Sequence, residues 1–113
     1  MNATQLNRIF FFRSLLSEEF NKYSEVETNV LIGIYLMNKK YERCSSKTLS
    51  EFLSKIHRTP NKKTLLASIR KFKMEDMIRI CRAGQGIKMH LTMHGILYLF
   101  ELERKLKMLR VKP

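Results

Sequence analysis

Residues 48–92 read TLSEFLSKIHRTPNKKTLLASIRKFKMEDMIRICRAGQGIKMHLT, and the spacing of the apolar residues changes within this stretch. Up to about Glu75, apolar residues recur every three or four positions, which is typical of helices. From Met77 onward they alternate with polar residues, which is typical of strands. The stretch therefore predicts two helices followed by a two-stranded hairpin.

The first of these helices is short. Thr48 and Glu51 have the spacing of a capping box, in which two side chains satisfy the free amides at the start of a helix. We expect a helix over residues 49–56, followed by a turn at His57 and Arg58. Its apolar side consists of Leu49, Phe52, Leu53 and Ile56.

The second helix is expected from Pro60 to about Glu75, with Thr59 as its N-cap. Proline suits the first helical position, where no amide hydrogen is needed. The buried side of this helix consists of Leu65, Ile69 and Phe72. Its other side carries Asn61, Lys62, Lys63, Leu66, Ala67, Arg70, Lys71 and Lys73.

The hairpin is expected to pair residues 77–82 with residues 87–92. Between them, Ala83-Gly84-Gln85-Gly86 has the composition of a tight turn. One side of the ribbon then carries Ile78 and Ile80 on the first strand and Ile87, Met89 and Leu91 on the second.

Three further helices and a short link are predicted around this stretch. The apolar pattern favours a helix over residues 4–20, and a capping box at Ser24 and Glu27 opens another that runs to about Tyr41. Residues 44–47 form a short extended link. A last helix runs from its N-cap, Thr92, to about Arg110.

This order predicts a mainly α (α+β) fold, a winged helix-turn-helix with the elements α-α-(β)-α-α-β-β-α. We expect one domain over residues 1–113. Residues 1–42 support it or form a dimer, residues 43–92 form the helix-turn-helix and wing, and residues 93–113 form a dimerisation helix.

The charge is concentrated in the part of the chain that contains this motif. The chain has 22 Lys and Arg against 10 Asp and Glu, a formal charge of +12. Residues 1–42 contain equal numbers of basic and acidic residues, so the whole excess lies in residues 43–113. A basic face can simply be solvated, but such an imbalance favours a polyanionic partner, either nucleic acid or an anionic membrane surface.

In a helix-turn-helix, the second helix presents its outer residues to the major groove, and a wing can contact the neighbouring backbone. Lys62, Lys63 and Arg70 are the candidates for groove contacts, and Arg82 and Lys88 for a clamp on phosphate. The complete set of candidate DNA-binding residues is Asn61, Lys62, Lys63, Thr64, Ala67, Arg70, Lys71, Arg82, Gln85 and Lys88.

Three short motifs resemble the winged-helix core of bacterial transcription regulators of the MarR/PadR type. They are Thr48-Leu49-Ser50-Glu51-Phe52-Leu53, Thr64-Leu65-Leu66-Ala67-Ser68-Ile69 and His90-Leu91-Thr92-Met93-His94-Gly95. The resemblance covers nearly the whole chain in the order of its elements and about half of it in motifs. It implies a winged helix that regulates transcription, with Asp76 and Met77 at a corner where the family often has glycine.

Both terminal helices carry more apolar surface than one small core can cover, so we expect a homodimer. Its interface is predicted to contain Phe10, Phe11, Phe12, Leu15, Leu99, Leu102, Leu106 and Leu109. The leucine seam could instead pack on the chain's own first helix. The phenylalanine cluster could be a membrane wedge, but acidic residues oppose the basic ones beside it, so core or dimer contacts are favoured.

Other functions have little support in the sequence. The cysteines and histidines lack the spacing of a metal site, and no catalytic motif is present, so we expect a protein without metal or cofactor that is not an enzyme. No transmembrane run or signal peptide is seen, which predicts a cytoplasmic protein, associated with the nucleoid if it is bacterial. No polar cluster identifies a small-molecule effector.

We therefore predict sequence-specific binding of double-stranded DNA by a homodimer that regulates transcription. One alternative is a sequence-indifferent nucleic-acid binder, such as an accessory protein of a plasmid, phage or virus. Another is a protein-interaction module that uses the winged helix as a scaffold.

Overall fold

The computed structural model describes residues 23–40, 43–55, 60–83 and 86–111, and leaves out the side chains of Glu25, Ala83 and residues 106–111. In chain order the elements are α2 (Glu25–Lys39), α3 (Ser46–Lys55), α4 (Lys62–Met74), β1 (Ile78–Ala83), β2 (Gly86–Leu91) and α5 (Met93–Val111). This mostly helical chain with one two-stranded antiparallel sheet agrees with the predicted α+β class. The helix predicted over residues 4–20 lies outside the described residues.

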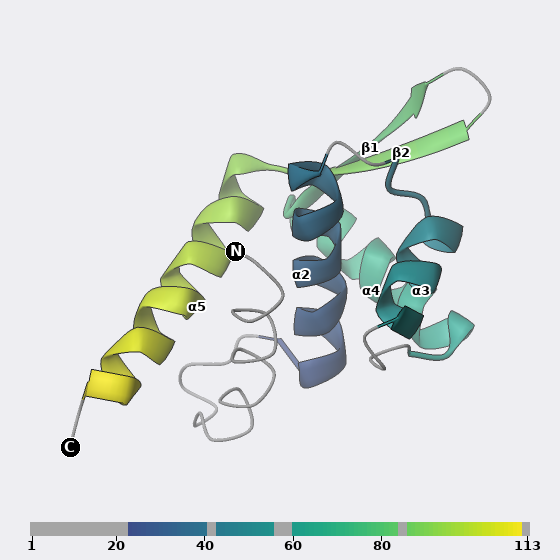
Figure 1. The fold of residues 1–113 in the computed structure, drawn as a ribbon. Helices are drawn as coiled ribbons and strands as arrows, with labels where there is room; N and C mark the ends of the chain where they lie inside the picture. The colour runs from purple at the N-terminus through teal and green to yellow at the C-terminus, as the bar shows by residue number, and fades with distance from the viewer. Residues whose placement is uncertain (1–22, 41–42, 56–59, 84–85, 112–113) are drawn as a thin grey trace.

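Figure 1 shows α2 at the centre of the molecule, with α5 on one side of it and α3 and α4 on the other. The hairpin projects beyond the helices. Helix α2 begins at the predicted capping box: Ser24 Oγ accepts from the Glu27 amide at 3.2 Å, and Glu27 Oε1 accepts from the Ser24 amide at 2.9 Å. The helix is buried on more than one side, because Ile32 and Leu36 are buried as well as Val30, Leu31, Ile34 and Met37.

Helix α3 begins at Ser46, three residues before the predicted start. Thr48 is not the cap. Instead Ser45 Oγ accepts from the Thr48 amide at 3.2 Å, and Thr48 Oγ1 accepts from the Ser45 amide at 2.8 Å. This reciprocal pair satisfies two amides, so it opens the helix earlier than Thr48 and Glu51 would. The expected strand-like link over residues 44–47 is correspondingly wrong, since Ser46 and Lys47 are helical.

Helix α4 is capped by Asn61 and not by Thr59. The Asn61 side chain accepts a hydrogen bond from the Thr64 amide at 2.8 Å. Asparagine is a stronger N-cap residue than threonine, which explains why the helix starts two residues after the predicted position. The predicted anchors Leu65, Ile69 and Phe72 are buried, and Ser68 beside them is buried too.

A left-handed residue connects α4 to β1. Asp76 has a φ of 58°, a left-handed conformation that residues other than glycine seldom adopt. The carbonyl of Asp76 accepts from Thr92 Oγ1 at 2.6 Å, and the Met77 carbonyl accepts from the Thr92 amide at 3.0 Å. Gly95 is required beside this corner, because a Cβ there would overlap the Met77 carbonyl oxygen. The start of α5 is thereby fixed against the end of α4.

The hairpin has the predicted alternation. Ile78 pairs with Leu91, Ile80 with Met89 and Arg82 with Ile87, and these pairs share the face that points to the core. The outer edge of β2 is covered by two other residues. The side-chain amide of Asn38 donates to the Met89 carbonyl at 3.0 Å, and its oxygen accepts from the Leu91 backbone amide at 2.9 Å. The Cys44 carbonyl accepts from the Met89 backbone amide at 2.8 Å. The 43–45 link thus lies beside the second strand of the hairpin.

Helix α5 contributes to the chain's own core. Thr92 caps it as predicted, accepting from the Gly95 amide at 3.1 Å. Leu99 and Leu102 are only 0% and 2% exposed within the single chain, so their predicted place in a dimer interface is wrong. They pack in the core that also contains residues of α2, whereas the alternative predicted for them, packing on the chain's own first helix, concerns a segment outside the described residues. Of the other predicted interface residues, the side chains of Phe10, Phe11, Phe12, Leu15, Leu106 and Leu109 lie outside the described part.

Candidate nucleic-acid interface

Helix α4 divides its residues sharply between a buried and an outer side. Because a helix turns once in about 3.6 residues, Lys63, Ala67 and Arg70 follow one another along the outer side. The residues exposed on α4 are Lys62, Lys63, Leu66, Ala67, Arg70, Lys71, Lys73 and Met74. Most of the predicted DNA-contacting residues of this helix are therefore available to a partner.

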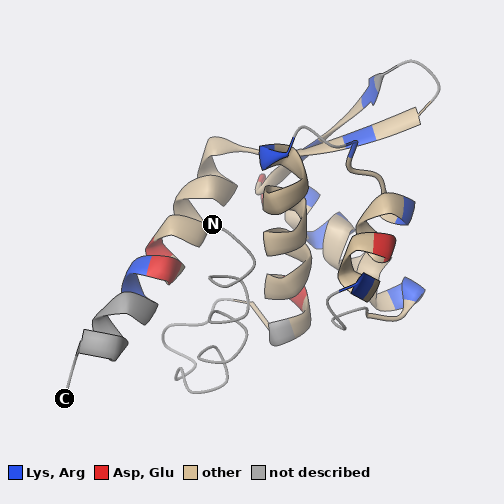
Figure 2. Cartoon of the chain, in the orientation of Figure 1, with Lys and Arg blue, Asp and Glu red and all other residues tan. Residues whose placement is uncertain are grey.

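Four cations on this surface, Lys62, Lys63, Arg70 and Lys73, are not neutralised. Within the described residues, no carboxylate forms an ion pair with any of them. Figure 2 shows basic segments on the hairpin, on α3 and on α4, with one acidic segment on α3, whereas α5 carries acidic and basic segments next to each other. Unpaired cations on a protruding helix attract a polyanion.

Lys71 differs from the other basic residues of α4, because it already has a partner. Its Nζ lies 2.9 Å from Glu27 Oε2 and 5.3 Å from the centre of the Tyr23 ring. The hydrogen bond to Glu27 raises the pKa of Lys71. Partial burial acts to raise the pKa of Glu27, but hydrogen bonds from Lys71 and Ser24 outweigh it and lower that pKa. Lys71 thus connects α4 to α2, and its role as a DNA contact stays a prediction.

Tyr23 reinforces this connection from the other side. Its ring packs edge-on against Phe72 of α4 at 5.0 Å and against Tyr98 of α5 at 5.2 Å, and its hydroxyl donates to Glu75 Oε1 at 2.7 Å. Burial, together with this bond to Glu75, raises the pKa of Tyr23. The end of α4 is therefore held in place by two other segments while its beginning points outward.

Two predicted contact residues at the start of α4 have structural roles. Asn61 is exposed, but its side-chain oxygen caps the helix, and Thr64 is half-buried and provides the amide that Asn61 accepts from. The Thr64 carbonyl also accepts from Ser68 Oγ at 2.9 Å. Lys62 and Lys63 are the residues in this turn whose charged ends are free to bind.

Arg82 and Lys88 do not form the predicted clamp. Arg82 pairs with Ile87 across the hairpin, whereas Lys88 pairs with Cys81, so the two cations lie on opposite faces of the ribbon. The reason is that side chains alternate between faces along a strand and that Lys88 follows Ile87 directly. Gln85, the third candidate in the hairpin, lies outside the described residues.

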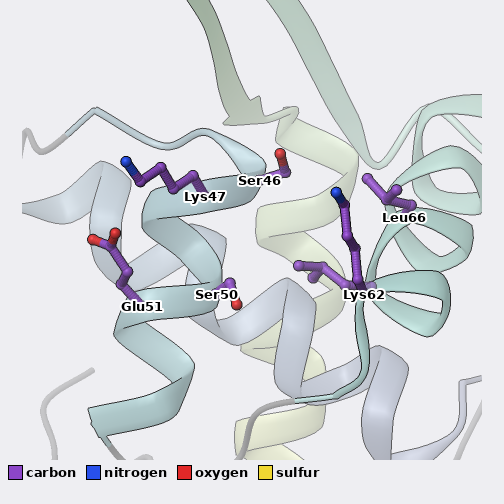
Figure 3. A pocket seen from close by; sticks show the side chains of 7 residues that line it. Ser46, Lys47, Ser50, Glu51, Lys62 and Leu66 are labelled. Atoms are coloured by element: carbon purple, nitrogen blue, oxygen red, sulfur yellow. The ribbon is translucent and has the colours of Figure 1, made fainter.

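A hollow of about 430 Å³ lies between α3 and α4. In Figure 3, Lys62 extends from α4 toward Ser46 at the start of α3, while Lys47 and Glu51 project to the other side of α3. The lining residues are Ser46, Lys47, Ser50, Glu51, Lys62, Leu65 and Leu66. Ser46 and Lys47 are not among the predicted contacts, although the spacing of Ser45 and Thr48 indicates that both lie in the first turn of α3.

Other kinds of site are not seen in the described residues. None of their His, Cys, Asp and Glu side chains gather in groups of three or more that could hold a metal ion. No helix in this part of the chain has the length and apolar character needed to cross a bilayer. The chain has no significant match to a protein-family model, a curated protein or a solved structure.

Proposed function

We propose that this chain is a winged-helix protein that binds double-stranded DNA sequence-specifically and regulates transcription. In this proposal α3 and α4 are the helix-turn-helix and the β1–β2 hairpin is the wing. The observation that carries the proposal is the outer side of α4, where Lys62, Lys63, Arg70 and Lys73 are exposed and have no ion pair within the described residues.

The chemistry of these side chains assigns them different tasks. Arg70 can donate two parallel hydrogen bonds to the edge of a guanine, which distinguishes one base from another. Lys62 and Lys63 carry compact charges that attract phosphate or a single base acceptor. The buried Leu65, Ile69 and Phe72 keep the helix at a fixed orientation, so these contacts are made in a fixed register.

The homodimer remains a prediction. Leu99 and Leu102 were expected in its interface, but both residues belong to the chain's own core. A dimer of winged helices would place two α4 helices in successive major grooves about 34 Å apart. Such a dimer would select DNA sites made of two inverted half-sites.

A sequence-indifferent nucleic-acid binder is the second candidate. It is favoured by the composition of the α4 surface, where three of the four unpaired cations are lysines. Lysine supplies charge with little direction, so it suits phosphate better than base edges.

Selection of bound duplexes from a random pool, at about 150 mM salt, separates these functions. We expect enrichment of one motif, with two inverted half-sites if the protein is a dimer. Tight binding without any enriched motif would support the sequence-indifferent binder. Failure to bind duplex DNA at this salt concentration would contradict both and would favour the protein-interaction module.

A further inference from the structure

Arg43 lies outside the helix-turn-helix in sequence but reaches the hairpin in space. A Cβ built on Gly86 would be 2.5 Å from Arg43 Cζ and 3.2 Å from Nη1, and it would overlap Nη2. The guanidinium therefore occupies the space directly over the Gly86 Cα. Only a residue without a side chain leaves room for it there.

This position puts Arg43 on the outer face of the wing. Gly86 pairs with Ala83, Lys88 with Cys81 and His90 with Arg79, and these pairs share the face that points away from the core. Arg43 thus adds a cation to this face of β2 beside Gly86, which has no side chain of its own. Positions 86 and 88 are about 7 Å apart along the strand, so Arg43 and Lys88 form a row of positive charge.

The backbone around Arg43 holds its side chain in this place. Its own carbonyl accepts from Thr48 Oγ1 at 2.8 Å, and the next residue, Cys44, is buried and bonded to Met89 of β2. The Arg43 side chain itself is exposed and forms no ion pair with the described residues. Arg43 is therefore an exposed cation without an ion pair in the described residues, on a backbone that is held between the wing and the start of α3.

We infer that Arg43 is a further nucleic-acid contact that binds the phosphate backbone at the wing. Gly86 makes this possible, because its lack of a side chain leaves room for the Arg43 guanidinium over the wing. This inference rests on the proposed function. Arg43 joins the cations of the hairpin to Lys47 and Lys62 at the hollow between α3 and α4. The bound backbone then meets cations on the wing, at the start of α3 and at the start of α4, with Glu51 of α3 as the acidic residue beside them.

The test measures duplex binding by fluorescence anisotropy at several salt concentrations, for the wild type, Arg43→Gln and Arg104→Gln. Arg104 is the matched control, because it is an exposed arginine of α5 that pairs with Glu101. We expect Arg43→Gln to weaken binding roughly tenfold and to reduce the log–log salt slope by about 0.9 for each chain bound. Arg104→Gln should leave both quantities near the wild-type values.

Gly86→Ala provides an independent variant that retains every charge. Gly86 does not have a left-handed φ, so alanine fits its backbone and has to displace only the flexible end of Arg43. We expect Gly86→Ala to weaken binding severalfold in the wild type and to have no further effect in Arg43→Gln, because both changes remove the same contact. Circular dichroism should show that both variants remain folded.

The outcomes separate this inference from the proposed function. If the wild type does not bind duplex DNA, both fail. If the wild type binds but Arg43→Gln keeps its affinity and salt slope, the Arg43 contact is refuted while the proposed function stands. Fully additive effects of Arg43→Gln and Gly86→Ala would likewise refute the part that Gly86 plays in placing Arg43.

Discussion

Helices α4 and α5 are anchored in the same core but present opposite chemistry to solvent. The outer side of α4 carries Lys62, Lys63, Arg70 and Lys73 without ion pairs in the described residues. On α5 the exposed large residues Met93, Leu97 and Phe100 are apolar, and Arg104 is paired with Glu101.

This difference shows that the two helices carry charge of different composition. Among the described side chains of α5, Arg104 and Lys105 lie within a turn of Glu101 and Glu103, whereas α4 itself contains cations and no acid, although holding like charges together is unfavourable. A polyanion bound along α4 would relieve this repulsion. Variants of the two helices and of their neighbours can test whether the unpaired cations of α4, and not those of α5, bind DNA.

Leu99 and Leu97 on α5 provide the largest contrast. Leu99 is completely buried and Leu97 is 57% exposed. We expect Leu99→Ala to lower the free energy of unfolding by about 2–5 kcal/mol, because it leaves a cavity in the core, whereas Leu97→Ala should change it by less than about 0.5 kcal/mol. Urea denaturation measures both. If Leu99→Ala left stability unchanged but dissociated a dimer in light scattering, Leu99 would belong to an interface after all.

Asn61 tests the role of the capping residue at the start of α4. Asn61→Ala removes the acceptor for the Thr64 amide, and we expect a loss of about 1 kcal/mol in the free energy of unfolding. Asn61→Asp keeps a capping oxygen, so it should preserve stability, but its negative charge beside the lysines should weaken DNA binding. Equal DNA affinity for Asn61→Asp and the wild type would place the DNA away from the start of α4.

Cys44 supports the link that carries Arg43. Burial raises the pKa of its thiol from an ordinary value of 9.0 to about 12. A raised pKa means that the unfolded state loses its proton first, so stability is complete below pH 9 and declines as the pH rises toward 12. Between pH 9 and pH 10, we expect ionisation of this thiol in the unfolded state to lower the free energy of unfolding by about 1 kcal/mol. Cys44→Ala should flatten the decline over that range, and an unchanged slope would show that the thiol ionises in the folded protein.

Glu27 tests whether Lys71 is held back from DNA. Glu27→Gln removes the charge that pairs with Lys71. Because the Lys71 side chain is 45% exposed and that of Glu27 is 17% exposed, solvent screens the pair in part, and we expect the free energy of unfolding to fall by about 1 kcal/mol. The released Lys71 should increase DNA affinity slightly and make the salt slope steeper. Glu101→Gln on α5 is the control, since it removes the same charge and also breaks an ion pair. Equal effects of the two changes would mean that only net charge matters.

Much of the fold could be predicted from local patterns. The capping box at Ser24 and Glu27, the buried stripe of Leu65, Ile69 and Phe72, and the alternation of the hairpin depend on residues close together in sequence, and the structure confirms them. The starts of α3 and α4 were misplaced because two capping residues competed at each, and the choice depends on geometry. Ser45 prevailed over Thr48, and Asn61 over Thr59.

The features that the sequence could not predict depend on contacts between distant segments. The pairing of Lys71 with Glu27, the burial of Leu99 by the chain's own core and the position of Arg43 over Gly86 each join residues from different elements. Charge alone does not show which cation has a neutralising partner. The exposed cations of α4 could be identified in advance only because the buried stripe fixes which side faces outward.

Two matched double variants test the central claim most directly. Lys63→Ala, Arg70→Ala removes two unpaired cations from α4, and Arg104→Ala, Lys105→Ala removes the same two residue types from α5. In duplex binding at about 150 mM salt, we expect the α4 variant to lose roughly a hundredfold in affinity and the α5 variant less than about threefold. Equal losses, or an α4 variant that binds like the wild type, would contradict the assignment of α4 as the DNA-binding helix.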